Sequence, residues 1–270
     1  MSNKINFSWI INYSCNYRCP YCVFEPCREY VLKKEKYFSK EQILSAWAHI
    51  RDKYGEAIID ISGGEPTIYP DFLNIVKELS TLHRISLNTN LSIAADYIIN
   101  NLDSSRVSLS VSFQPFFEKI TDMASKLNLL KTMHWNIQVA CVAWPPLINN
   151  LENYYAFLRS FNFKAIPFRG VYDGKIYPFD YTPEEKDIID KYIARREGVK
   201  FSTEPAKVNG RICRAGQIFA NIMPNGEVLR CGSGQELIYK NFFDGNFAFL
   251  DRPASCKAEY CDCLDWVVCA

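Results

Sequence analysis

The stretch Ile5–Cys22, INFSWIINYSCNYRCPYC, decides how the rest of the chain is interpreted. It begins with the apolar segment Ile5–Ile11, which predicts a β-strand. Three cysteines follow, Cys15, Cys19 and Cys22, with three and then two residues between them. In parallel barrels, the loops that follow the strands carry the chemistry. The stretch therefore predicts a first strand whose loop presents three thiols at the carboxyl face of a sheet.

Downstream of this loop, strand and helix patterns alternate. Further strands are expected at 57–61, 84–87, 107–113, 137–143 and 163–168, and helices at 72–79, 94–102, 116–130 and 151–158. Capping boxes at Ser39 and Thr182 open two more helices. Such alternation predicts an α/β fold with a parallel sheet and right-handed crossovers. Six β-α units can form an open doubly wound sheet or a partial (β/α)6 barrel, and the pattern leaves both open.

Composition limits the classes of function. The chain has 270 residues, 48% hydrophobic and 23% charged, with a net charge of +1, as in ordinary globular proteins. This balance gives little support to a nucleic-acid partner. The sequence shows neither a secretory signal nor an apolar segment long enough for a membrane span, so we expect a cytoplasmic protein. Cytosolic cysteines stay reduced, and the eleven clustered cysteines therefore predict metal binding or catalysis rather than disulfides.

The spacing of Cys15, Cys19 and Cys22 resembles the CxxxCxxC signature of the radical S-adenosylmethionine (SAM) superfamily. Ser62–Pro66, SGGEP, resembles the GGEP motif of the same family. The resemblance implies a partial (β/α)6 TIM barrel and a [4Fe–4S] cluster held by the three cysteines, with one iron open for SAM. It further implies an oxidoreductase or isomerase that cleaves SAM to a 5′-deoxyadenosyl radical, with flavodoxin or ferredoxin as electron donor. A zinc knuckle with Cys27 as fourth ligand is the alternative, and the GGEP motif disfavours it.

The resemblance also implies a set of SAM-binding residues. Tyr21 would contact the adenine, Gly63, Gly64 and Glu65 the amino group and methionine portion, and Ser110 and Ser112 the ribose. Two departures from the family pattern stand out. Ser112 occupies a position that is often Asp in relatives, and Leu91 replaces the usual Gly after Thr89-Asn90. Glu65 has a second possible role, which is to support its own loop.

A second group of cysteines follows residue 212. Seventeen residues separate Cys213 from Cys231, and Gly226 precedes Cys231 by five, a spacing similar to that of SPASM/twitch domains. The segments 219–223 and 227–229 predict a hairpin that brings the two cysteines together. The resemblance implies an auxiliary [4Fe–4S] cluster, whose other ligands we expect among Cys256, Cys261 and Cys263, while Cys269 frays at the terminus. Structural zinc is the alternative here as well.

We accordingly expect a radical SAM core over 1–198 and a small auxiliary domain over 199–270. Since the first strand begins near residue 5, no preceding peptide-recognition domain is expected, and the leading hypothesis is hydrogen abstraction from a small polar metabolite, giving dehydrogenation or epimerisation. The alternative is a maturase of ribosomally made peptides, and a third class is a zinc-binding adaptor. Arg169, just after the sixth predicted strand, is a candidate either for binding an anionic substrate or for a structural ion pair.

Overall fold

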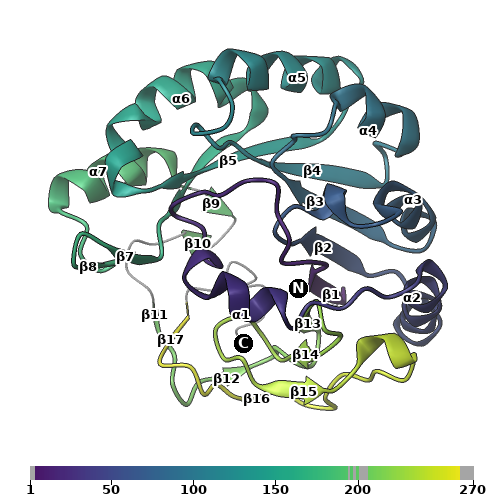
Figure 1. Ribbon diagram of the computed structural model, residues 1–270. Coiled ribbons are helices and arrows are strands. Elements are labelled where there is room, and N and C mark those ends of the chain that lie inside the picture. The colour runs from purple at the N-terminus through teal and green to yellow at the C-terminus, as the bar shows by residue number, and fades with distance from the viewer. Residues whose placement is uncertain (1–3, 194, 197–198, 201–205, 262–270) are drawn as a thin grey trace.

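The computed structural model describes residues 4–193, 195–196, 199–200 and 206–261. Its strands β1 to β6 pair in parallel and in chain order. They are β1 (Asn6–Ile10), β2 (Ile58–Ser62), β3 (Arg84–Thr89), β4 (Val107–Ser112), β5 (Ile137–Ala143) and β6 (Phe163–Pro167). The sheet curves, with the helices on its outer side (Figure 1). The prediction of a partial parallel barrel is confirmed, and the open doubly wound alternative is wrong.

The outer helices are α2 (Lys40–Tyr54), α3 (Phe72–Leu82), α4 (Ala95–Asn101), α5 (Ile120–Thr132), α6 (Leu151–Leu158) and α7 (Pro183–Tyr192). The short α1 (Arg28–Leu32) follows the cysteine loop. Both predicted capping boxes form, at Ser39 and at Thr182. Short 3-10 helices lie at Glu25–Cys27, Pro66–Ile68, Pro145–Asn150, Arg159–Phe161 and Phe242–Asp244. The described part of the chain contains no helix that is both long and apolar enough to cross a membrane.

Helix α5 begins four residues later than predicted. We expected it from Phe116, but the helix starts at Ile120. The segment before it forms a turn in which the Phe117 and Glu118 amides both donate to the carbonyl of Gln114. The Phe117 ring stacks on Tyr17 of the cysteine loop, with centroids 4.4 Å apart. This contact with a distant loop, which a helical pattern cannot register, holds the segment outside the helix.

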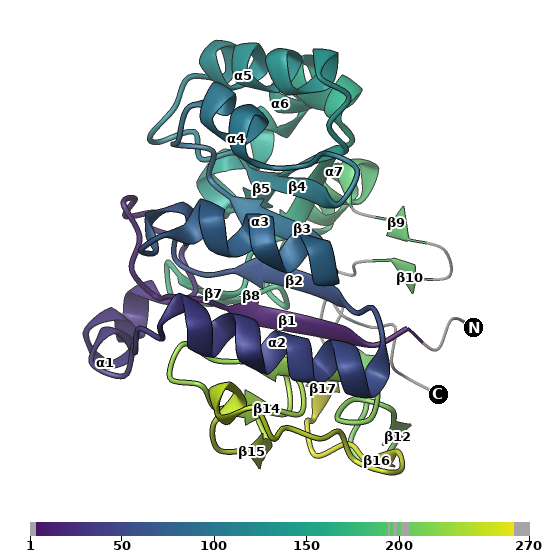
Figure 2. The same cartoon turned by 90° about the vertical axis from the view of Figure 1, so that its right-hand side faces the viewer.

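The sheet continues beyond β1 into the C-terminal part of the chain. The predicted hairpin forms from β13 (Phe219–Ile222) and β14 (Val228–Leu229), which are antiparallel, and β15 (Leu237–Tyr239) follows. Strand β13 also pairs in parallel with β1, so one sheet of nine strands runs through the described residues. Figure 2 shows this extension beside β1. Pairing with the hairpin removes the free edge that β1 would otherwise present.

Four two-stranded ladders complete the described structure. They join β7 (Gly170–Tyr172) to β8 (Lys175–Tyr177), β9 (Arg195–Arg196) to β10 (Val199–Lys200), β11 (Ala206–Lys207) to β17 (Tyr260–Cys261), and β12 (Ile212–Cys213) to β16 (Ala254–Ser255). Each ladder pairs antiparallel. The last two place the cysteine-rich segments after residue 212 side by side, although they are far apart in sequence.

Candidate functional site

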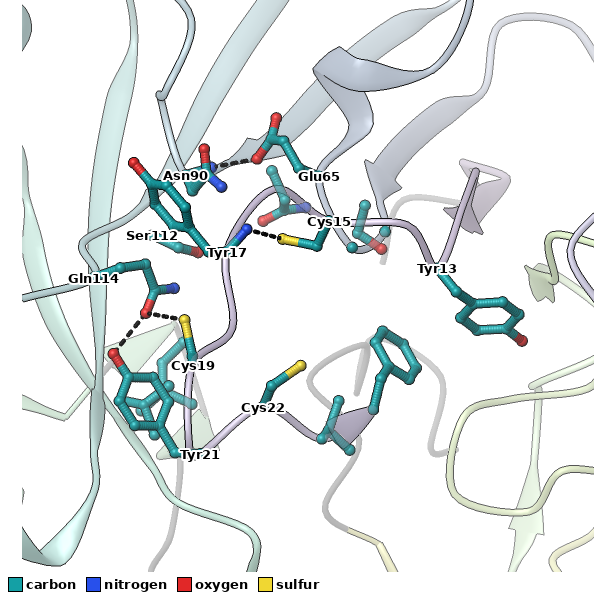
Figure 3. Close-up of a pocket in the computed structure, with 18 of the residues that line it drawn as sticks. Tyr13, Cys15, Tyr17, Cys19, Tyr21, Cys22, Glu65, Asn90, Ser112 and Gln114 are labelled. Atoms are coloured by element: carbon teal, nitrogen blue, oxygen red, sulfur yellow. Dashed lines mark hydrogen bonds between the residues drawn. The ribbon is translucent and has the colours of Figure 1, made fainter. Parts of the chain in front are cut away.

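A pocket of about 480 Å³ lies where the barrel strands end, and all but one of the residues predicted for the N-terminal cluster and SAM line it (Figure 3). They are Cys15, Cys19, Tyr21, Cys22, Gly63, Gly64, Glu65 and Ser112. Ser110 does not line it, because it lies two residues earlier on β4 and therefore deeper in the barrel. Cys27 is exposed and Cys141 is buried, and neither lines the pocket. The structure thus brings the motifs from β1, β2 and β4 to one cavity.

The cysteine loop is held by a carboxylate that the sequence did not single out. One oxygen of Glu35 accepts hydrogen bonds from the Tyr13 amide at 2.6 Å and the Ser14 amide at 2.9 Å, and the other accepts from Ser14 Oγ at 3.0 Å. Glu35 lies between α1 and α2, outside every motif. A charged acceptor on two successive amides fixes the backbone immediately before Cys15.

The two glycines after β2 are required by close contact with this same loop. The Gly64 amide donates to the Asn12 carbonyl and the Glu65 amide to the Ser14 carbonyl, each at 2.9 Å. A Cβ on Gly63 would lie 2.2 Å from Asn12 Oδ1, and one on Gly64 would lie 2.2 Å from the Ser14 carbonyl oxygen. Any larger residue would therefore push the GGEP segment away from the cysteine loop.

Glu65 is fully buried and its carboxylate is engaged by the protein. One oxygen accepts from the Thr67 amide at 3.1 Å, Thr67 Oγ1 at 2.7 Å and Thr89 Oγ1 at 2.8 Å. The other oxygen accepts from the Asn90 amide at 2.7 Å. The geometry therefore gives Glu65 the loop-supporting role, tying the ends of β2 and β3 together, while it still forms part of the pocket wall.

The raised pKa values of two thiols, Cys15 and Cys19, are consistent with a site that binds a metal cation. Burial, and after it the neighbouring Cys22 and Cys15 thiols, raise the pKa of Cys19 to about 12. Burial also raises the pKa of Cys15, and Arg28, a pocket-lining cation, acts in the opposite direction on both. Positive charge brought beside Cys15 and Cys19 would favour their thiolate forms, and iron would supply it. The donor set therefore fits the cluster that the motif implies.

Two polar residues of the site escaped sequence reasoning. Gln114 lies just after β4 and accepts hydrogen bonds from Tyr21 and Cys19. Asn16 lies within the cysteine loop and accepts from Asn90 Nδ2 at 2.9 Å. No periodicity or motif marks either position. The one available signal was that Gln114 follows a strand whose carboxyl end was expected at the site.

The C-terminal cysteines meet through tertiary contacts. Cys213 is on β12, Cys231 follows β14 and Cys256 follows β16. Burial raises the pKa of the Cys231 thiol, and the charges of Cys256 and Cys213 raise it further, so both lie within electrostatic range of Cys231. Backbone amides donate to two of the sulfurs, from Gly234 to Cys231 at 3.1 Å and from Ala215 to Cys213 at 3.5 Å. Cys261 lies on β17, whereas Cys263 and Cys269 fall outside the described residues.

A buried arginine organises this second group. Arg230 is 4% exposed. Its guanidinium donates to the carbonyls of Ala215 at 2.7 Å, Cys213 at 2.9 Å and Ser255 at 2.6 Å, and also to that of Ala254. It therefore connects the segments that carry Cys213 and Cys256 immediately beside Cys231.

Arg169 is shared between two cavities. It lines the main pocket and also a second cavity of about 330 Å³, which Ser233 and Tyr260 line from the C-terminal part. The anion-binding hypothesis for Arg169 is compatible with this position.

A partial barrel with a three-cysteine loop beside a glycine-rich loop defines a class, and comparison with known proteins identifies it. Residues 9–138 match the model of the radical SAM superfamily. A GTP 3',8-cyclase of Microcystis aeruginosa is 27% identical over 89 residues, which are 33% of this chain and 26% of that protein. The chain thus matches only about a quarter of this curated relative's length.

Solved structures extend the similarity of fold to most of the chain. SuiB of Streptococcus suis has a TM-score of 0.61 at 14% identity. The alignment covers 89% of this chain and 64% of the SuiB chain. The structure of anSMEcpe with bound AdoMet and Cp18Cys peptide has a TM-score of 0.60 at 15% identity. The alignment covers 88% of this chain and 78% of the anSMEcpe chain. Residues 9–138 of the chain therefore form a radical SAM domain.

Proposed function

We propose that Cys15, Cys19 and Cys22 bind a [4Fe–4S] cluster on which SAM is reductively cleaved. The observation that carries the proposal is the convergence of three thiols and the Gly63–Gly64 loop on one pocket. When bound, the cluster and SAM supply a 5′-deoxyadenosyl radical that removes a hydrogen atom from the substrate. The chain's own residues hold the loop, enclose the nucleotide and limit the access of water.

The residues proposed around SAM follow from their places in the pocket wall. Tyr21 is proposed for the adenine, and the Gly63–Glu65 segment for the amino group and methionine portion. For the ribose, Ser112 is favoured over Ser110, because Ser112 lines the pocket and Ser110 does not. A one-electron donor such as flavodoxin or ferredoxin completes the proposed set of partners.

We propose a peptide as substrate, rather than the small metabolite that sequence alone favoured. The first support is the fold shared with anSMEcpe, whose structure contains a peptide. The second is a group of exposed aromatic rings near the pocket-lining Tyr17 and Tyr21, in which Phe116, Phe117 and Tyr172 are 51%, 42% and 37% exposed. Phe116 and Tyr172 pack on Trp144, with centroids 5.8 Å and 4.9 Å away. A group of exposed aromatic rings of this kind suits a substrate that extends beyond the pocket.

A nucleotide is the second candidate substrate. GTP 3',8-cyclases are among the curated relatives, and this observation favours a small molecule. Their matching segments, however, span about a quarter of their lengths, so the similarity bears on the cluster and SAM more than on the substrate.

For the second group we propose an auxiliary [4Fe–4S] cluster bound by Cys213, Cys231 and Cys256, with a fourth ligand from Cys261 or Cys263. The support is that Cys213 and Cys256 act electrostatically on Cys231, and that backbone amides donate to the sulfurs of Cys231 and Cys213. Four-thiolate sites accept zinc as well, so anaerobic iron and sulfide analysis tests this proposal.

The decisive experiment uses the anaerobically reconstituted full chain with dithionite and SAM, and measures 5′-deoxyadenosine. Deuterated peptides encoded near the gene are then compared with deuterated GTP. We expect deuterium to pass from a peptide into 5′-deoxyadenosine. Transfer from GTP alone would overturn the peptide proposal, and failure to cleave SAM at all would overturn the proposed function.

A further inference from the structure

Gln114 stands between two groups of the proposed SAM site. It lies two residues beyond the end of β4 and lines the main pocket. Its side-chain oxygen Oε1 accepts the Tyr21 hydroxyl at 2.6 Å and the Cys19 thiol at 3.4 Å (Figure 3). One amide therefore contacts both the ring proposed for the adenine and a cysteine proposed for the cluster.

The donor and acceptor roles of these groups change when Cys19 becomes a metal ligand. A neutral thiol donates its proton to Oε1, but a ligating thiolate has no proton and only accepts. The amide oxygen would then face a negatively charged sulfur. A half-turn of the amide replaces Oε1 by Nε2, which carries two hydrogens. The Tyr21 hydroxyl both donates and accepts, so it can hold the amide in either orientation.

We propose that Gln114, anchored by Tyr21, is a positioning residue that donates a hydrogen bond to the Cys19 sulfur and raises the reduction potential of the N-terminal cluster. The inference rests on the proposed function, since it requires Cys19 to bind iron. Hydrogen bonds to cluster sulfurs are one of the protein's means of setting cluster potentials. A donor favours the reduced state because reduction adds negative charge near the sulfur.

Gln114 differs from the hydrogen-bond donor of Cys15, because Gln114 contacts its cysteine through a side chain. Cys15 receives its hydrogen bond from the backbone, with the Tyr17 amide 3.3 Å from its sulfur. Substitution cannot easily remove a backbone donor. The side chain of Gln114 can be replaced, so the contribution of a single donor to the cluster is measurable.

The test is an EPR-monitored redox titration of the reconstituted full chain, following the signal that changes on SAM addition. In Gln114→Met, which keeps the length of the side chain and removes the amide, the ratio of reduced to oxidised cluster at a fixed potential should fall about tenfold. For a one-electron couple this corresponds to about 59 mV. Tyr21→Phe, which keeps the ring and removes the anchor, should shift the potential in the same direction by less.

Gln138→Met is the matched control. Gln138 lies on β5 and accepts from Lys164 Nζ at 2.7 Å. It is a half-buried glutamine of the same barrel that does not line the main pocket, and its replacement should leave the potential unchanged.

Three outcomes decide the matter. A loaded Gln114→Met protein with the wild-type potential overturns the inference and leaves the proposed function intact. If Gln114→Met does not fold, an unchanged potential in Tyr21→Phe overturns it instead. Wild-type protein that binds no iron at Cys15, Cys19 and Cys22 defeats the proposed function itself, which is a separate result.

Discussion

The two cysteine groups of this chain are built in opposite ways. Cys15, Cys19 and Cys22 share one loop after one strand, whereas Cys213, Cys231 and Cys256 come from three segments that meet through β-ladders. The cysteines of the first group are close together in the sequence, so their motif can be recognised from the sequence alone. The second group exists only after the chain has folded, so spacing identifies its members but not how they are assembled.

The supports of the two groups are also of opposite charge. The carboxylate of Glu35 accepts from successive backbone amides before the first group, while the guanidinium of Arg230 donates to carbonyls around the second. In each case a single charged side chain organises the backbone around the cysteines. The predictions below test whether the two groups depend on these supports independently.

The largest contrast should come from the ligands themselves. Cys19→Ala removes one of only three proposed thiolates at the SAM cluster, and we expect loss of that cluster's iron and complete loss of 5′-deoxyadenosine formation. Cys213→Ala should keep SAM cleavage and lose product formation. Iron analysis and chromatography of 5′-deoxyadenosine measure both effects.

Cys27→Ser is the control for this pair, because Cys27 is exposed and does not line the pocket. Its iron content and SAM cleavage should equal those of the wild type. If Cys19→Ala still cleaves SAM, the N-terminal loop does not bind the cluster that cleaves SAM. The proposed functional difference between the two cysteine groups would then be wrong.

The support of the second group provides the next effect. Arg230→Met leaves one buried and three partly buried carbonyls without their donor, and we expect a loss of about 3 kcal/mol of stability. The auxiliary iron should be lost while SAM cleavage continues. Chemical denaturation and iron analysis of Arg230→Met measure this, with the exposed Arg252→Met as control. Equal loss of SAM cleavage and auxiliary iron would show that the two groups are not independent.

The sequence predicted six β-α units because their periodicity is local, and capping boxes at Ser39 and Thr182 mark the start of two helices. The pattern did not distinguish a barrel from an open sheet, and the family resemblance implied the barrel. The sequence predicted the hairpin at Gly226 because that signal is local too, since the turn residues are adjacent. It did not predict that β13 would pair with β1, because strand pairing across about two hundred residues leaves no periodic trace.

At the site, motifs identified residues that line the pocket but not the residues that support them. Glu35, Gln114 and Arg230 each make several hydrogen bonds to backbone or side chains distant in sequence. Isolated polar residues of this kind look the same in a sequence as solvated surface residues. Their roles become visible only when the partners that they contact are in place.

A smaller effect is expected at Glu35. Glu35→Gln keeps one acceptor oxygen and removes the charge, so the amides of Tyr13 and Ser14 should be bound less firmly, by about 1 kcal/mol. Hydrogen exchange at these amides should quicken, while the exchange of amides around Arg230 stays unchanged. Glu78→Gln, at a partly exposed ion pair with Lys40, is the control. Exchange that is unchanged at Ser14 would contradict the proposed support of the first group.

The smallest expected effect is a pH dependence of unfolding free energy that comes from the barrel and not from the second cysteine group. All three histidines of the chain, at positions 49, 83 and 134, precede the second group. His83 is fully buried, accepts from the Ala57 amide at 3.1 Å through Nδ1 and contacts the Trp47 carbonyl at 3.0 Å through Nε2, an arrangement that suits the neutral ring. Burial lowers its pKa. The unfolded chain therefore binds the proton more readily, and the contribution of His83 is full above about pH 6.5 and declines as the pH falls below it.

His83→Gln should consequently flatten the fall in unfolding free energy between about pH 7 and about pH 5, because an amide can make the same two hydrogen bonds without titrating. Denaturation series at several pH values measure the slope. The iron content of the second group should show no dependence on this substitution, since no histidine lies among its described residues. An unchanged slope would mean that acid acts on the barrel through other groups, and an altered auxiliary iron content would mean that the barrel core and the second group unfold as one unit, as the shared sheet of β1 and β13 permits.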